Sequence, residues 1–218
     1  MLGVDIMTGH WEFTLGEKLF LDNIKNFKGD FVAQNIKLTE EAIFDGMEPI
    51  DDQNHFQKPY VVKIINGIRV VVIGQAFPYT PIANPGRFVP NLTFGIRDME
   101  LQILIDQIKE KEKPSLIVLL SHNGVDVDKK MASKVNGLDI ILGGHTHDVL
   151  PKPIIINNNS SKTIILNSGC NGKFVSVLDL HVKKSSFEYK YKLLPIMSSQ
   201  IKPSITMSEF INKKKKPH

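Results

Sequence analysis

Residues 115–148 constrain the fold most strongly, because they read as two buried strands joined by a helix. The apolar runs Ser115–Leu120 and Leu138–Leu142 each fit a strand that is covered on both faces. Between them, three apolar residues recur at helical spacing: Val127, Met131 and Val135. Consecutive strands linked by a helix run parallel in one sheet. We therefore expect an α/β fold in which the loops that follow both strands lie at the same edge of the sheet.

Other segments predict further elements of the same fold. Asn66-Gly67 between two β-branched runs favours a hairpin over residues 60–74. Helices are predicted near residues 19–27 and 97–111, and a strand over 31–36, whereas 38–56 looks acidic and irregular. The proline-rich loop 75–94 is long enough to line an active site. After residue 150, the chain favours strands that we expect to form the second sheet of a sandwich: 153–156, 163–166, 173–182 and 187–194.

Charge and cysteine content narrow the possible functions. Much of the +4 net charge comes from Lys213–Lys216, so the body of the chain is near neutral and a nucleic-acid surface is not expected. No apolar run approaches the length needed to span a membrane, and residues 1–7 do not resemble a signal peptide. Cys170 is the only cysteine, which excludes an internal disulfide. It also has no histidine near it in sequence to activate it as a nucleophile.

Four histidines are candidate metal ligands, because each lies in a loop after a short apolar strand and near a glycine: His10, His122, His145 and His147. Neutral imidazoles bind divalent transition metals well. A lone His-x-His pair can equally be two surface residues, but four histidines in three such loops are less easily explained in that way. The other three histidines, His55, His181 and His218, have no comparable setting and are interpreted as structural or exposed.

The motifs resemble those of a known superfamily. Ser-His-Asn-Gly at 121–124, followed by Gly-Gly-His-Thr-His-Asp at 143–148, resembles the late motifs of binuclear metallophosphoesterases of the 5′-nucleotidase type. Residues 5–16, 73–85 and 121–128 are also similar to the SoxB thiosulfohydrolase family of periplasmic sulfur oxidation. The resemblance runs through nearly the whole chain.

This resemblance implies a partial four-layer α/β/β/α sandwich and two manganese (Mn) ions. His10, in the place of an asparagine ligand of nucleotidases, would bind one ion together with His122 and His145, and His147 would bind the other. Residues 1–197 would belong to the catalytic domain, and 198–218 would be a tail or the start of a C-terminal domain. The early Asp-x-His and Gly-Asp motifs would lie upstream of Met1. The implied location is the periplasm, and the implied partner is a SoxYZ-type sulfur carrier whose own cysteine bears the substrate.

One departure from the nucleotidase pattern favours sulfur chemistry. Nucleotidases have a histidine and an aspartate that act as a pair on the reacting phosphate, and the resemblance places Trp11 and Thr14 at these positions. An alkoxide leaving group benefits from a proton donor, whereas a persulfide leaves readily as an anion. We therefore expect hydrolysis of a cysteine S-thiosulfonate that releases sulfate. Three alternatives stay open: Trp11 is a core residue, the chain is a nucleotidase-like phosphoesterase, or it is an inactive fragment.

Overall fold

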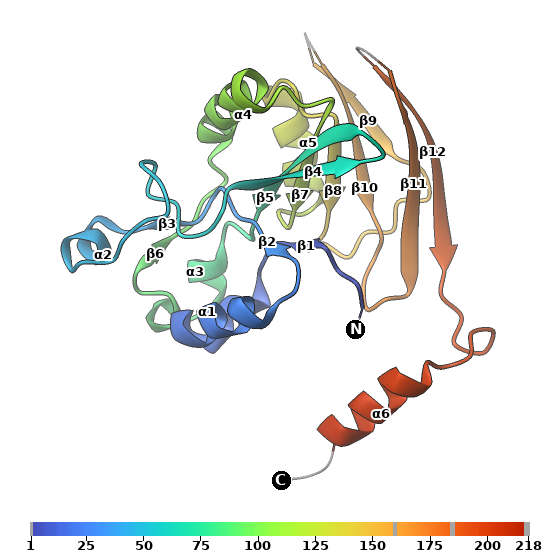
Figure 1. Cartoon of the computed structure of the whole chain (residues 1–218), viewed down its shortest axis with the longest axis horizontal. Helices are drawn as coiled ribbons and strands as arrows, with labels where there is room; N and C mark the ends of the chain where they lie inside the picture. Colours follow the sequence, from blue (N-terminus) through green and yellow to red (C-terminus); the bar gives the residue numbers. More distant parts are fainter. Residues whose placement is uncertain (1, 159–160, 184–185, 216–218) are drawn as a thin grey trace.

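A six-stranded mixed sheet forms the centre of the computed structural model, which describes residues 2–158, 161–183 and 186–215 (Figure 1). Its strands lie in the order β4-β5-β7-β8-β10-β9. The four inner strands run parallel: β5 (Ile68–Gln75), β7 (Leu116–Ser121), β8 (Ile140–Gly143) and β10 (Lys162–Asn167). The edge strands β4 (Tyr60–Ile65) and β9 (Ile154–Asn157) run antiparallel to their neighbours. The expected α/β class is confirmed.

Two layers cover the faces of this sheet (Figure 1). Helices α4 (Asp98–Glu112) and α5 (Val125–Lys134) pack on one face, and the hairpin of β11 (Phe174–Val182) and β12 (Phe187–Pro195) covers the other. Alternation along β5 shows how the faces divide, because successive side chains of a strand point to opposite sides. Val71 and Ile73 join the helical core, whereas Val70 and Val72 join the core under the hairpin.

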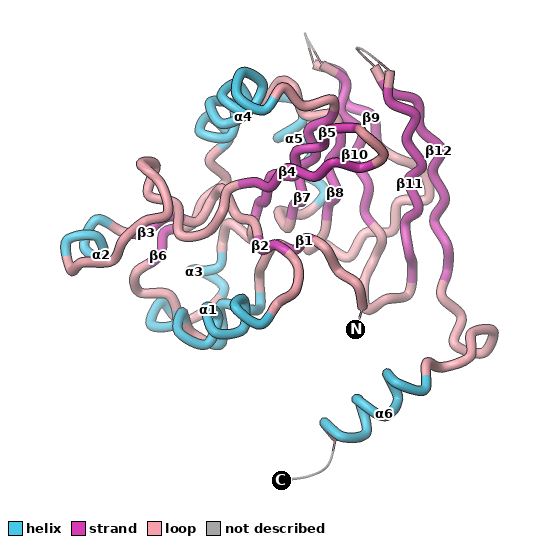
Figure 2. Tube along the Cα trace, viewed as in Figure 1, coloured by secondary structure: helices cyan, strands magenta, loops and turns pink. Residues whose placement is uncertain are grey.

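A separate aromatic core holds the N-terminal third of the chain beside the sheet. Phe13 and Phe20 are buried with their ring centroids 4.5 Å apart, and Phe31 packs edge-on at 5.0 Å from Phe20. Mostly loops and short elements surround this core (Figure 2). These elements are β1 (Ile6–Met7), η1 (Trp11–Leu15), α1 (Glu17–Asn26), β2 (Asp30–Phe31), β3 (Lys37–Leu38), α2 (Glu40–Phe44), α3 (Thr80–Ala83), η2 (Gly86–Phe88) and β6 (Leu92–Thr93).

The sequence-based prediction for the C-terminal strands was partly wrong. Residues 154–157 and 162–167 do not belong to the second sheet: they extend the central sheet, with β10 parallel to β8. The physical reason is burial, because residues 163–167 are all buried, as in a strand covered on both faces. In the described part of the chain, the second sheet consists of β11 and β12; β12 exposes alternate residues along most of its length, whereas β11 exposes Val175 and residues 179–181.

Two further predictions need correction. The expected strand over 31–36 is reduced to β2, since residues 32–36 are buried but irregular. The backbone N–H of Gln34 there donates to the Gly74 carbonyl at 2.8 Å. The segment after residue 195 contains a helix that the pattern did not indicate, α6 (Ile205–Lys214), which buries no residue and lies away from the sheet (Figure 1). Lys216 and His218 lie outside the described residues. No helix in the described part of the chain has the length and apolar character needed to cross a membrane.

The hairpin turn between β4 and β5 provides a first prediction. Asn66 and Gly67 adopt positive φ angles of 51° and 79°, as a type I′ turn requires. We expect Gly67→Ala to lower the free energy of unfolding by about 1–2 kcal/mol, because a left-handed backbone penalises a Cβ. Urea denaturation measures this change. Asn66→Gly is the control and should be close to neutral; equal losses in both variants would contradict the explanation.

Candidate metal centre

His10 is placed by the loop between β1 and η1. Its backbone N–H donates to Glu12 Oε2 at 2.7 Å, and the preceding Gly9 carbonyl accepts from Phe77 N at 3.0 Å. A Cβ on Gly9 would come within 2.9 Å of the Phe13 ring, so the loop needs glycine here to lie against the aromatic core. As a result, His10 is only 7% exposed and its ring faces the edge of the central sheet.

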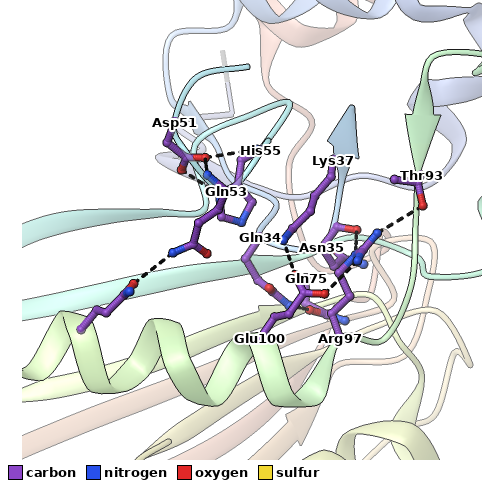
Figure 3. A network of polar contacts seen from close by, with 11 residues as sticks. Gln34, Asn35, Lys37, Asp51, Gln53, His55, Gln75, Thr93, Arg97 and Glu100 are labelled. Carbon is purple, nitrogen blue, oxygen red and sulfur yellow. Dashed lines mark hydrogen bonds and ion pairs between the residues drawn. The ribbon is translucent and has the colours of Figure 1, made fainter. Parts of the chain in front are cut away.

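His122 follows β7 directly, at the carboxyl end of a parallel strand. Its backbone N–H donates to the Gln75 carbonyl at the end of the neighbouring β5 at 2.8 Å. The side chain of Gln75 is fully buried and accepts from Gln34 Nε2 at 2.5 Å, within the polar network drawn in Figure 3. Gln75 Nε2 also donates to Asn123 Oδ1 at 3.2 Å. The end of β5 therefore fixes both His122 and the residue after it.

His145 and His147 lie in the loop after β8, and both have a left-handed backbone, with φ angles of 77° and 60°. Non-glycine residues adopt this conformation rarely, and it is often found at functional sites. Thr146 between them anchors the loop: its hydroxyl accepts from Val125 N, the first residue of α5, at 3.3 Å and donates to Asp148. The strained turn is thus held against the start of α5.

The structure brings three of the four predicted ligands together. The candidate ligand nitrogens of His10, His122 and His145 lie within 4.8 Å of one another. Nδ1 of His10 and Nε2 of His122 are 3.2 Å apart. Nitrogens that share one ion at about 2.1 Å each lie at most about 4.2 Å apart, so the three side chains fit a single ion after small adjustments. His147 is exposed and lies outside this group, so its assignment to a second metal stays a prediction.

The electrostatics keep these imidazoles neutral, which is the form that binds metals. Burial lowers the pKa of His122 to about 4, with further contributions from the charges of His10, His145 and His147. Burial is also the main cause that lowers the pKa of His10 and the pKa of His145. The charge of His147 makes a smaller contribution in the same direction at His145. Three neutral nitrogen donors suit a divalent transition metal. The donor set therefore fits a divalent transition metal ion, without specifying which one.

Phe77 belongs to the site, although nothing in its local sequence marks it out. Its ring stacks on His145 at a centroid distance of 4.0 Å and packs against His10 at 4.2 Å. It comes from the proline-rich loop 75–94, which was predicted to line an active site as a whole. The side chain is 7% exposed, so it closes one side of the histidine group to water.

The remaining candidates have separate places. Trp11 is 69% exposed with its ring 5.1 Å from that of His10, so it is not a core residue. His55 is buried in another part of the chain, where its Nδ1 lies 2.7 Å from Asp51 Oδ2, and His181 is exposed on β11; both fit the predicted structural or exposed role. Cys170 is partly buried in the turn before β11 and lies outside the histidine group.

Comparisons with known proteins find the same fold in solved structures. No family model matches the chain. It is 27% identical over 94% of its length to a 5′-nucleotidase of Diplobatis ommata, of which it covers 36%. A solved structure of the sulfate thiohydrolase SoxB from Thermus thermophilus superposes with a TM-score of 0.84 at 28% identity, over 97% of this chain and 36% of that one.

A 5′-nucleotidase precursor from Thermus thermophilus superposes with a TM-score of 0.81 at 25% identity, over 96% of this chain and 42% of that one. The chain thus spans between 36% and 42% of the length of these three proteins. In sequence and in fold, the chain is therefore similar to metallophosphoesterases of the 5′-nucleotidase type.

Proposed function

We propose that the three clustered histidines of this chain form part of a metal-dependent hydrolytic site that acts on a cysteine S-thiosulfonate. The substrate would be held by a SoxYZ-type carrier protein in the periplasm, and Mn²⁺ would be the bound metal. Hydrolysis would break the bond between the sulfone sulfur and the persulfide sulfur, form a sulfur–oxygen bond with water, and release sulfate. The partner, the location and the identity of the metal rest on the resemblance of residues 5–16, 73–85 and 121–128 to the SoxB family.

The position of Trp11 is the observation that carries the proposal. It stands exposed beside His10, where the nucleotidase pattern has the histidine of its acid–base pair. Thr14, at the position of the aspartate, donates its hydroxyl hydrogen to the Trp11 carbonyl at 2.7 Å. Neither side chain can supply a proton to a strongly basic alkoxide at neutral pH. A persulfide leaving group needs no such donor, so a site with Trp11 and Thr14 at these positions suits a thiosulfonate better than a phosphate ester.

The side chains of the site have distinct parts in such a reaction. His10, His122 and His145 would hold the ion, and Phe77 excludes water from the side of the cluster that it covers. When bound, a divalent ion supplies Lewis acidity that polarises an oxygen of the substrate and activates water. Trp11 offers an apolar surface at the open side, where the persulfide end of the substrate would lie.

A nucleotide phosphoesterase is the second candidate. The similarity to the 5′-nucleotidase of Diplobatis ommata extends over 94% of the chain, and the fold matches the 5′-nucleotidase precursor closely. In that case, the leaving alkoxide would need a proton from a group other than Trp11 or Thr14. The two candidate functions therefore differ in whether the site must provide a proton donor for the leaving group.

Product analysis separates the candidates. The purified chain is incubated with Mn²⁺ and either a thiosulfonated carrier protein or AMP, and sulfate and phosphate are measured by ion chromatography. We expect sulfate release that EDTA abolishes and added Mn²⁺ restores, with phosphate release at least about tenfold slower. Faster release of phosphate than of sulfate would contradict the proposal. Metal binding without turnover of either substrate would favour the inactive-fragment alternative.

A further inference from the structure

Asp128 is a buried acidic residue that the metal centre described above does not include. It lies in the first turn of α5, on the face that also buries Met131 and Ala132, and is fully buried. Burial raises the pKa of this carboxyl to about 6 against the opposing hydrogen bonds. Charged side chains are seldom buried without a compensating role. The contacts of its two carboxylate oxygens indicate what that role is.

One carboxylate oxygen of Asp128 forms hydrogen bonds with the loop that contains His122. Asp128 Oδ1 accepts from Ser121 Oγ at 2.6 Å and lies 3.3 Å from Asn123 Nδ2. These two residues flank His122 on either side, and the backbone N–H of Asn123 also donates to Ser121 Oγ at 3.2 Å. A single carboxylate oxygen thus ties together both neighbours of one candidate ligand.

The other oxygen faces the loop that carries His145. Asp128 Oδ2 lies 2.7 Å from the point where a Cβ on Gly143 would stand, so the carboxylate occupies the space directly beneath this glycine. Gly143 is the last residue of β8, two positions before His145. Any side chain at position 143 would collide with Asp128. The carboxylate and the absent side chain therefore set how closely the loop after β8 approaches α5.

We infer that Asp128 is a positioning residue that holds the loops of His122 and His145 at the spacing needed to bind one metal ion. This role rests on the metal site of the proposed function but not on its substrate. The hydrogen bonds of Asp128 in the described part of the chain go to Ser121 and Asn123 rather than to a histidine, so it acts through these two residues and Gly143. Residues that orient metal ligands typically change metal affinity by about 10- to 100-fold when they are replaced.

Cobalt titration of purified variants tests the inference, because Co²⁺ reports both affinity and ligand geometry through its visible absorption. We expect Asp128→Ala to weaken Co²⁺ binding by about 10- to 100-fold and to alter the spectrum. Asp128→Asn keeps an acceptor oxygen for Ser121 and should stay within about threefold of the unaltered chain. Asp126→Asn is the matched control on the same helix, since the Asp126 side chain is 88% exposed and forms a surface ion pair with Lys129 at 3.1 Å; it should change nothing.

A second measurement keeps the inference testable without metal. The ring nitrogen shifts of His122 and His145 in the metal-free chain should move in Asp128→Ala and not in Asp126→Asn. If Asp128→Ala does not fold, Ser121→Ala replaces it and should weaken Co²⁺ binding in the same direction. A folded Asp128→Ala variant with unchanged affinity and ring shifts would overturn the inference, as would equal losses in Asp128→Asn. An unaltered chain that binds no Co²⁺ would contradict the metal site instead, while the ring shifts would still decide the role of Asp128.

Discussion

Replacing His122 with alanine is expected to abolish tight metal binding by the chain. The three rings form a nearly equilateral group: the His122 centroid lies 5.1 Å from that of His10 and 5.3 Å from that of His145, and the latter two are 5.0 Å apart. Its removal leaves two nitrogen donors and an open space where the third stood. Because replacing mere supporting residues costs about 10- to 100-fold in affinity, loss of a direct ligand should cost at least about 100-fold. Isothermal titration with Mn²⁺ or Co²⁺ measures the effect.

The His122 variant should keep its fold, which separates loss of a ligand from loss of structure. His122 is held in the neutral form by burial, with its pKa lowered to about 4, so its removal leaves no buried charge uncompensated. His181→Ala is the control, since His181 is an exposed histidine in a strand outside the cluster, and it should bind metal as the unaltered chain does. Equal metal affinity in the two variants would show that the three-histidine cluster is not the site.

The second large effect is expected for Gly74→Ala, at the penultimate position of β5. A Cβ on Gly74 would stand 2.0 Å from the carbonyl oxygen of Val32 and 2.7 Å from the Ala33 nitrogen. These are backbone atoms, so no rotamer change relieves the collision. Overpacking of a well-packed core typically costs about 1–3 kcal/mol, and a collision with backbone should reach about 3 kcal/mol or more. Denaturant unfolding measures the loss.

This substitution should also weaken metal binding, because the displaced segment leads into the site. The Gly74 carbonyl accepts from Gln34 N at 2.8 Å, and the carbonyl of the next residue, Gln75, accepts from the backbone N–H of His122. Gly86→Ala provides the matched control, since its Cβ would meet no atom within 4 Å and its φ is not positive. The control should be neutral in both measurements. A Gly74→Ala chain as stable as the control would contradict the close approach of residues 32–33 to β5.

The sequence predicted elements well where local chemistry decides them. The Asn66-Gly67 turn and the helix-linked strands β7 and β8 are set by turn residues and hydrophobic period, and all formed as expected. It was harder to predict which sheet a strand joins, because an apolar strand has the same sequence pattern in either sheet. Residues 162–167 could join β8 or the outer hairpin, and the choice depends on burial of both faces, which a single strand cannot reveal.

For the candidate metal centre, the sequence predicted three histidines that the structure brings together, but not the residues that support them. His10, His122 and His145 could be selected because each follows a strand and lies near a glycine. Phe77 gave no such signal within a long loop, although its ring contacts two of the three ligands. Asp128 gave only a weak signal, because it is an acidic residue on the apolar face of a helix. Nothing in the local sequence shows that it lies beneath Gly143.

The sequence by itself determined which residues can bind a metal and that two of their loops lie at one edge of a parallel sheet. Both follow from residue chemistry and from the right-handed, parallel connection of β7 to β8. The family resemblance implied that His10, 112 residues from His122, shares their site, but only the tertiary structure shows how the chain brings His10 there. That contact depends on an aromatic core and a buried polar network that bring the N-terminal loop to the ends of β5 and β7. Packing between distant segments, rather than local propensity, assembles the site.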